Sequence, residues 1–330
     1  MKTNDTHPIH LNAAGVDVLV YDTQRAAGEA AAHCVAEHAK SAAERGNDVC
    51  FWFMAAPSGF AFYRAFVDRV REDSQVADIV RKSTFYQFDD YPIARDDPAF
   101  VVTFRALLEE HVRRPLAGVI GAPPRFEFLE VGSDRDESIA AEYTQKLRSR
   151  LEDTQTTVIQ VKGIGMDGHW GFHDRSIPLE GRPEIMEVKL GSQNLHQQMI
   201  DWPQYFETVA DVPSSAFTAN VPMFLMADRV VDIVPQASKQ FSVLATYGTD
   251  DVVNSIPSSA IKKHHNASAF LTRAAAEVLL SFTERLAAGA TTLSDSELEQ
   301  LRALWGEPGA PFREENIGAM MNVLRELGLT

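Results

Sequence analysis

The sequence predicts an α/β protein whose core is a doubly wound, mainly parallel β-sheet flanked by helices. Short runs of β-branched and aromatic residues recur along the 330-residue chain with almost no charge, as strands buried on both faces of a parallel sheet do. Longer amphipathic or alanine-rich segments with helical periodicity lie between these runs. Repeated alternation of strand and helix favours a parallel, doubly wound sheet.

The first predicted strand and helix lie near the N-terminus. Residues 16–21 alternate like a strand. Asp22 or Thr23 can cap the helix that follows, because a side-chain oxygen at this position accepts a free N–H of the first turn. The alanine-rich helix continues through Glu44, and Gly46 ends it.

Two further strands run into polar turns. Residues 49–54 read as a second buried strand, which is followed by the turn Ala-Ala-Pro-Ser-Gly and an amphipathic helix over residues 60–71. Residues 84–88 form a third strand that leads directly into Asp89 and Asp90. If the strands are parallel, these turns share one edge of the sheet, where ligands usually bind in open α/β folds.

The rest of the chain continues the alternation. The remaining expected elements are helices at 99–113 and 134–151 around a short strand at 126–130, and then alternating strands and helices through 158–161, 187–190, 229–234, 239–247, 267–271 and 274–286. Residues 289–330 offer two helical patterns broken by Gly-Glu-Pro-Gly. We therefore expect one Rossmann-like domain over residues 1–288 and a helical C-terminal extension over 289–330, which acts as a cap or an oligomer contact.

Composition narrows the function classes. A net charge of −15 argues against a nucleic-acid or anionic-membrane partner, since either needs a surplus of Lys and Arg. No apolar run is long enough for a membrane span, and the first residues lack the apolar core of a signal peptide. Cys34 and Cys50 are expected to be buried thiols in a reducing compartment. These observations predict a cytoplasmic protein that binds a small molecule, with a homo-oligomer left open.

The loop after the strand at 158–161 concentrates chemistry. Its glycines let the backbone turn tightly and let a ligand approach the main chain. The loop contains Gly163, Gly165 and Gly168 together with Asp167, His169, His173 and Asp174. Because these groups follow a buried strand, the loop reads as a site at the carboxyl edge of the sheet.

Asp89 and Asp90 follow the third strand at the same predicted edge. A carboxylate there can act as a general base, with its pKa raised by partial burial or by its neighbour. The plainer interpretation is a turn or helix-cap aspartate, which we would prefer for an isolated Asp-Asp pair. Two acidic loops at matching strand ends reverse that preference.

A metal site is the alternative for His169 and His173, whose spacing of four residues suits two ligands on one helical turn. Three glycines and Trp170 make a regular helix here unlikely, and no third soft ligand lies nearby in the sequence. A structural histidine satisfied by hydrogen bonds is the other alternative. We expect catalysis with no metal and no cofactor.

The motifs resemble the glucosamine-6-phosphate deaminase and 6-phosphogluconolactonase family of sugar-phosphate enzymes. The resemblance extends over residues 16–286 and rests on KGIGMDGHWGFHD, STFYQFDDY, ANVPMFLMADRVVDIVPQASKQ and FWFMAAPSGFAFYRAFV. It implies that Asp89 is the base at C1 and C2 of the sugar, and that Asp167 and His169 form the family's Asp-Gly-His loop. Asp174 matches the extra acid of the deaminases, and the Asp-Asp-Tyr string also favours that branch over the lactonases.

The departures from the family concern phosphate. The family's phosphate loop is rich in Gly, Ser and Thr, whereas here Ala56 and Pro57 precede Ser58, and proline has no N–H to donate. Lys239 matches the family's phosphate-facing lysine, but no arginine occurs in LHQQMIDWPQYF, where typical deaminases have one. The resemblance implies substrate contacts from Ser58, Gly59, Asp90, Gly165, Gly168 and Lys239.

The expected function is that of an isomerase or deaminase acting on an amino sugar phosphate such as glucosamine 6-phosphate. His169, polarised by Asp174 or Asp167, would assist ring opening, and Asp89 would move a proton between C2 and C1. Two alternatives stay open: a hydrolase of the 6-phosphogluconolactonase type, which needs no base at C2, and a sugar-phosphate-binding protein that has lost the reaction.

Overall fold

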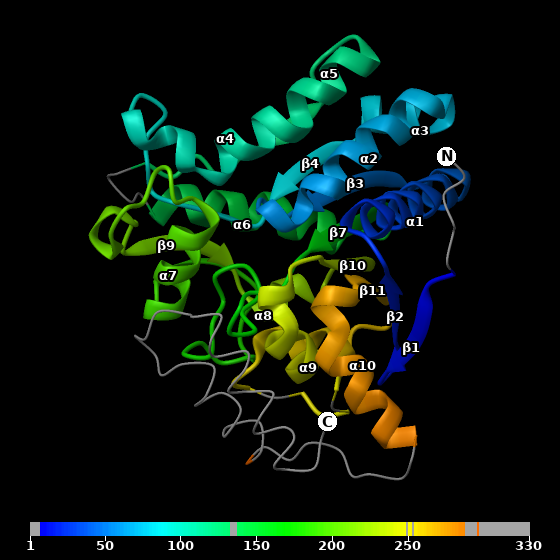
Figure 1. The fold of residues 1–330 in the computed structure, drawn as a ribbon. Helices are drawn as coiled ribbons and strands as arrows, with labels where there is room; N and C mark the ends of the chain where they lie inside the picture. The colour runs from blue at the N-terminus through cyan, green and yellow to red at the C-terminus, as the bar shows by residue number, and fades with distance from the viewer. Residues whose placement is uncertain (1–6, 133–136, 249, 253, 288–295, 297–330) are drawn as a thin grey trace.

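The centre of the computed structural model is one eight-stranded sheet (Figure 1). The structure describes residues 7–132, 137–248, 250–252, 254–287 and 296. Across the sheet the strands are β1 (Ile9–Ala13), β2 (Val16–Tyr21), β11 (Ala267–Thr272), β10 (Arg229–Val234), β7 (Thr156–Lys162), β3 (Asp48–Phe53), β4 (Thr84–Gln87) and β6 (Arg125–Glu127). Only the edge pair β1 and β2 is antiparallel. The predicted doubly wound, mainly parallel sheet is therefore confirmed.

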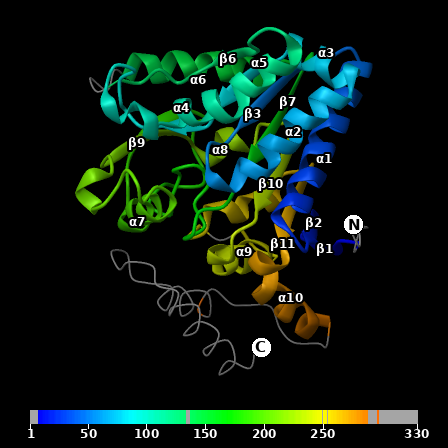
Figure 2. The same ribbon diagram turned by 45° about the horizontal axis from the view of Figure 1, so that its top comes forward.

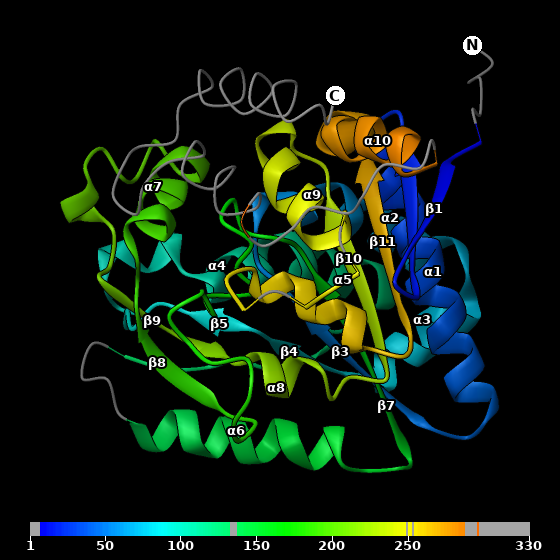
Figure 3. The ribbon, with the colours of Figure 1, turned by 90° about the horizontal axis from the view of Figure 1, so that it is seen from below.

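Helices cover both faces of this sheet. One face carries α1 (Gln24–Glu44), α2 (Phe60–Glu72), α3 (Ser74–Lys82) and α5 (Arg114–Ile120), and α4 (Phe104–Leu108) precedes α5 on the same side (Figure 2). The opposite side, seen from below in Figure 3, carries α6 (Glu137–Leu151), α8 (Val221–Phe224) and α9 (Gln240–Tyr247), with α10 (Arg273–Ala287) packed against α9. All seven residues of β7 are consequently buried.

Local signals explain where α1 begins and ends. Of the two predicted caps, Thr23 is the one used, and its hydroxyl accepts the N–H of Ala26 at 3.1 Å. Gly46, just beyond the helix, has φ of +85°, which favours glycine. Within the helix, Gly28 faces α2, where a Cβ atom would lie 2.7 Å from the backbone of Ala61. The two helices therefore pack closely because this position has no side chain.

Some predicted elements differ from the structure. Residues 187–190, expected among the alternating elements of the main sheet, belong instead to β8 (Ile185–Lys189) of a separate three-stranded antiparallel sheet. Its other strands are β9 (Ser215–Ala219) and β5 (Asp89–Asp90). The helix predicted at 99–113 is broken into a 3₁₀ turn (Pro98–Val102), α4 and a π turn (Glu109–Arg113), and α5 follows beyond the predicted range. Thr103 breaks it, because it is extended and caps α4.

Some elements of the structure have no counterpart among the predicted ones. They are the α-helices α3, α5, α7 (Ser192–Asp201) and α8 and the strands β1, β5 and β9. Cys34 and Cys50 are free thiols, the first half-buried and the second buried. No helix in the described part of the chain is long and apolar enough to cross a membrane. The predicted extension over 289–330 lies outside the described residues except for Ser296.

Candidate active site

A cavity lies at the carboxyl edge of the main sheet, where the loops after β3, β4, β7 and β10 meet and α7 forms an outer wall. Its empty space is about 560 Å³, including the open mouth. Five of the residues selected from the sequence line it, namely Ser58, Asp89, Gly165, His169 and Lys239. Four separate loops therefore converge as their placement after parallel strands predicts.

Asp89 lies at the inner end of this cavity. Its side chain is buried, and among the described residues no group donates a hydrogen bond to its carboxylate. Desolvation, and secondarily the charge of Asp90, raises the pKa of Asp89 well above its ordinary value. Gly171, with φ of +61°, makes room for it, because a Cβ atom there would lie 3.2 Å from Oδ2 of Asp89. The result is an unpaired, buried carboxyl group facing the cavity.

His169 is oriented by Asp167 within the loop. Its Nδ1 lies 2.7 Å from Oδ1 of Asp167, which also accepts the backbone N–H of His169 at 3.2 Å. Burial alone would raise the pKa of Asp167, but the interactions with His169 outweigh it and hold the pKa at about 2. A neutral imidazole that donates through Nδ1 keeps Nε2 as its proton acceptor. Gly165 lets the imidazole ring of His169 lie against the backbone, since a Cβ atom at position 165 would be 2.2 Å from the ring.

His173, in the same loop, is structural. It is fully buried, its Nδ1 accepts the N–H of Val221 at 3.1 Å, and its Nε2 donates to the carbonyl of Ile177 at 3.2 Å. Burial, only partly opposed by the bond to Ile177 and the charge of Asp174, lowers its pKa to about 4. His173 is therefore neutral at physiological pH and holds the loop against α8.

Asp174 does not polarise His169 in this structure. Its Oδ1 accepts the backbone N–H and the hydroxyl of Ser176, at 2.8 and 2.5 Å, and Asp174 is not among the residues that line the cavity. Of the two predicted partners of His169, only Asp167 contacts the imidazole. The acid that resembles the deaminases' extra carboxylate thus acts as a turn residue here.

Ser58 and Lys239 line the part of the cavity where the anionic end of a ligand was expected. The Ser58 hydroxyl donates to Oε1 of Gln236 at 2.9 Å, which ties the loop after β3 to the loop after β10. Lys239 is 3% exposed, and burial lowers its pKa, while Asp201 and Asp167 act in the opposite direction. No carboxylate of the described residues lies within ion-pair distance of its Nζ, so its charge is available to a ligand.

Two predicted glycine contacts differ from expectation. Gly59 does not line the cavity, and its N–H donates to the carbonyl of Ala56 at 2.9 Å, so it is not free for an anion. Gly168 also lies outside the cavity lining, and its carbonyl accepts the N–H of Ser258 at 2.8 Å. These backbone groups of the two glycines therefore form hydrogen bonds that shape the loops, and they are not available to a ligand.

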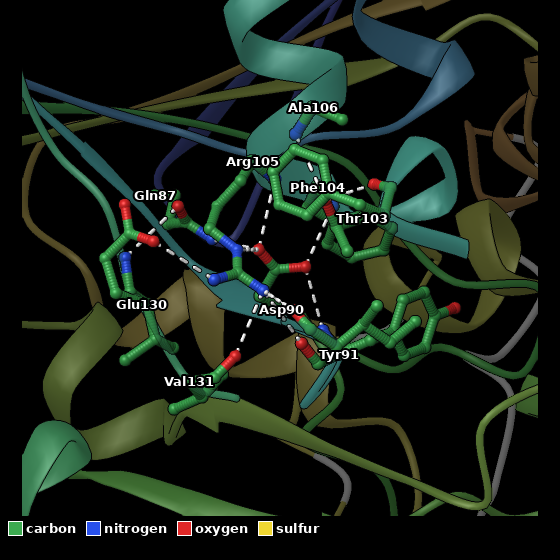
Figure 4. A network of polar contacts seen from close by, with 12 residues as sticks. Gln87, Asp90, Tyr91, Thr103, Phe104, Arg105, Ala106, Glu130 and Val131 are labelled. Atoms are coloured by element: carbon green, nitrogen blue, oxygen red, sulfur yellow. Dashed lines mark hydrogen bonds and ion pairs between the residues drawn. The ribbon is translucent and has the colours of Figure 1, made fainter. Parts of the chain in front are cut away.

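Asp90, predicted to bind substrate, is not among the residues that line the cavity. Figure 4 shows that its carboxylate lies instead beside the guanidinium of Arg105. Its carboxylate forms an ion pair with the Arg105 guanidinium, with 2.7 Å between Oδ2 and Nε, and both side chains are almost completely buried. A carboxylate so enclosed cannot reach a ligand. The expectation of substrate contact at Asp90 does not fit this placement, because the strand pleat directs neighbouring side chains to opposite faces.

The sequence reasoning missed α7 as a wall of the cavity. Gln197, Asp201 and Trp202 all line it. Gln197 fastens the helix to the loop, because its Oε1 accepts the N–H of Met166 at 3.0 Å and its Nε2 donates to Asp201 at 3.3 Å. The signal in the sequence is the segment LHQQMIDWPQYF, whose Gln, Asp and Trp residues supply these side chains.

Within the described residues, no group of three or more His, Cys, Asp or Glu side chains could hold a metal ion. The arrangement instead combines one unpaired acid, one acid-supported imidazole and one unpaired cation around a single cavity. Such a set can move protons at two separate positions of a ligand whose anionic end lies near Lys239.

Curated relatives of the chain are deaminases, although no protein-family model matches it. The glucosamine-6-phosphate deaminase of Corynebacterium glutamicum (strain R) is 25% identical over 270 residues, which are 80% of this chain and 94% of that protein. The glucosamine-6-phosphate deaminase of Shouchella clausii (strain KSM-K16) is 27% identical over 120 residues, but the match spans 36% of this chain and 46% of that protein.

Solved structures share the fold. A monomeric glucosamine-6-phosphate deaminase, described as a missing link of the NagB superfamily, gives a TM-score of 0.65 at 23% identity, covering 79% of this chain and 98% of that chain. A 6-phosphogluconolactonase from Trypanosoma brucei gives a TM-score of 0.54 at 14% identity, covering 79% and 98%. The comparisons confirm the resemblance that the motifs predicted: the chain is similar in sequence to glucosamine-6-phosphate deaminases, and it shares its fold with a glucosamine-6-phosphate deaminase and with 6-phosphogluconolactonases.

Proposed function

We propose that the protein is an aldose-ketose isomerase or deaminase that acts on an amino sugar phosphate such as glucosamine 6-phosphate. The observation that supports it best is the shared cavity, in which the unpaired carboxyl of Asp89 faces the same space as His169 and Lys239. A deaminase of this kind needs a base at C2, a second group for the ring oxygen and a cation for the phosphate. The cavity provides one candidate for each of these roles.

In this proposal His169 opens the sugar ring. Its Nε2 takes the proton of the C1 hydroxyl and returns it to the ring oxygen, which leaves an open-chain aldehyde. Asp167 keeps Nδ1 protonated and stabilises the imidazolium that exists between these two proton transfers. It can do so because the pKa of Asp167, about 2, keeps its carboxylate ionised.

Asp89 then acts on the open chain. Its carboxylate removes the proton from C2 while the aldehyde oxygen at C1 takes up a proton, which gives an enolamine. Delivery of the C2 proton to C1 and loss of one proton from the nitrogen then give an imine at C2. Attack by water on this imine releases ammonia and leaves a 2-ketose phosphate. A base works best when its pKa lies near the working pH, and burial moves the pKa of Asp89 in that direction.

The phosphate would be held by fewer groups than in the relatives. Lys239 supplies the positive charge and Ser58 a hydroxyl, while the turn at Pro57 provides no N–H. The carboxylate of Asp201 lies in the same cavity and favours a ligand that also carries positive charge, which an amino sugar phosphate does. Release of ammonia and ketose phosphate from glucosamine 6-phosphate tests the proposal directly.

A lactonase is the second candidate, and the position of Asp174 favours it. This residue is the acid that sets the deaminase branch apart in the sequence, yet it does not touch His169. In a lactonase, His169 would activate water against the lactone carbonyl, and no base at C2 is needed. Hydrolysis of 6-phosphogluconolactone that survives Asp89→Asn but not His169→Ala would support this candidate over the deaminase.

A further inference from the structure

The position of Asp89 is set by its backbone and not by contacts to its carboxylate. Within the described residues no donor bonds that carboxylate, whereas the main chain around it is held on both sides. Nε2 of Gln87 donates to the carbonyl of Asp89 at 2.9 Å, and the N–H of Ala219 donates to the carbonyl of Phe88 at 3.0 Å. Whatever fixes this turn therefore fixes the reactive group.

Asp90 is the centre of the contacts that fix the turn (Figure 4). Its Oδ1 accepts the backbone N–H groups of Tyr91 and Phe104 at 2.8 and 2.9 Å. Its Oδ2 accepts Nε2 of Gln87 at 3.1 Å and both the N–H and Nε of Arg105, at 3.1 and 2.7 Å. One carboxylate thus joins the end of β4 to the first turn of α4.

Arg105 extends these contacts to a third segment. Its Nη2 donates to the carbonyls of Ile93 and Val131 at 2.5 and 3.1 Å, and its Nη1 lies 3.3 Å from Oε2 of Glu130. The residue is 1% exposed. The planar guanidinium fork makes such divergent contacts possible, and a lysine ammonium could not reproduce them.

A buried ion pair is a poor source of stability, because the desolvation of both charges offsets much of their attraction. The effect of the pair on geometry is more direct here. Every residue that contacts Asp90 lies close in the sequence to Asp89 or to Phe104, which also lines the cavity. We propose that Asp90 and Arg105 form a positioning pair that holds the Asp89 carboxyl in its reactive place. This inference rests on the proposed role of Asp89 in proton transfer.

The decisive comparison is Arg105→Lys with Arg229→Lys. Arg229 is also a buried arginine with a forked set of contacts, to Asn266 and Ser268 at 2.6 Å each, but it begins β10 at the opposite edge of the sheet. Both variants keep the charge and lose the fork. A change of about 1 Å in a reacting group typically reduces turnover about 100-fold. We expect Arg105→Lys to lower kcat about 10- to 100-fold with little change in KM, and Arg229→Lys to change neither.

A second readout does not require turnover. The titration of the Asp89 carboxyl can be followed by carbon NMR, with Asp89→Asn providing the assignment. The other titratable groups that face or surround Asp89 are Asp90, His169, Lys239 and Asp201, and the buried phenols of Tyr63, Tyr91 and Tyr143. These groups are the same in both variants. We expect the Asp89 midpoint to fall toward that of an ordinary aspartate in Arg105→Lys only, because a loosened turn admits water.

Equal kinetics and equal Asp89 midpoints in the two variants would overturn the positioning pair. A wild-type protein that turns over no amino sugar phosphate would overturn the proposed function instead, and the NMR comparison would still decide the pair. If Arg105→Lys does not fold, Asp90→Asn replaces it, since the amide keeps the shape of the side chain and one acceptor oxygen. Because Asp90→Asn also removes a charge that raises the pKa of Asp89, its readout is the plateau of kcat at high pH, where Asp89 is fully ionised. We expect this plateau to fall with little change in KM, and an unchanged plateau contradicts the inference.

Discussion

Nδ1 of His169 and Oδ1 of Asp167 are 2.7 Å apart, and this contact makes the loop after β7 responsive to acid. Because the pKa of Asp167 in the fold is about 2, below its unfolded value, the contact stabilises the protein above about pH 4 and is lost as the pH falls toward 2. We expect Asp167→Asn to be less stable than the wild type by about 2 kcal/mol at pH 7, and the two to converge near pH 2. Denaturant unfolding of both proteins between pH 2 and pH 7 measures this difference in stability. A difference that does not change with pH would contradict the expectation.

Ionisation of Asp89 should change the stability of the fold in the opposite direction. Its pKa is raised in the fold, so its ionisation destabilises the protein as the pH rises above the unfolded value of about 4. An asparagine never ionises. We expect Asp89→Asn to melt at a higher temperature than the wild type at pH 8 and at the same temperature near pH 3. A difference in melting temperature that is the same at pH 3 and pH 8 would contradict the raised pKa of Asp89.

Lys162 and Asp232 form a second buried ion pair, with 3.0 Å between Nζ and Oδ2, beneath Trp170 of the loop. Removing one partner leaves the other charge buried and unpaired. Lys162→Met should therefore destabilise the fold by about 3–5 kcal/mol. Lys162→Met/Asp232→Asn should regain most of this, because the amide is neutral and still accepts the hydroxyl of Tyr247. Urea unfolding of the three proteins provides the test, and a double variant no better than the single one would refute the explanation.

Lys239 should act on the anionic end of the ligand. A charge-assisted contact contributes about 1.5–3 kcal/mol, so Lys239→Ala should weaken binding of a phosphorylated ligand roughly ten- to a hundred-fold. Binding of the same sugar without its phosphate should hardly change. Calorimetric titration with both ligands decides the matter. Equal losses for the two ligands, or none for either, would show that the phosphate does not lie beside Lys239.

The parts of the fold that the sequence predicted are those with local signals. The central part of strand β7, residues 158–161, is predictable as an uncharged run that stops at a glycine turn, and Thr23 is predictable as a helix cap, because both signals depend on neighbouring residues. The placement of Asp89, His169 and Lys239 in one cavity followed from a single rule, that parallel strands end at one edge.

What the sequence did not predict depends on pairings between distant residues. Asp90 read as a second site acid because its partner, Arg105, lies fifteen positions later in what appeared to be an ordinary helix. The small antiparallel sheet was missed since β8 and β9 identify one another only through their register. The role of α7 as a cavity wall likewise arises from the contact between Gln197 and the loop, which no periodicity reveals.

The central claim is that Asp89 moves a proton between C2 and C1 of an amino sugar phosphate. The most direct measurement is proton NMR of glucosamine 6-phosphate incubated in deuterium oxide with the wild type or Asp89→Asn. The wild type should release ammonia and give a ketose phosphate that carries deuterium at C1, whereas Asp89→Asn should bind the substrate and give neither product. Ammonia release by Asp89→Asn at the wild-type rate, or binding without any product by the wild type, would contradict the account.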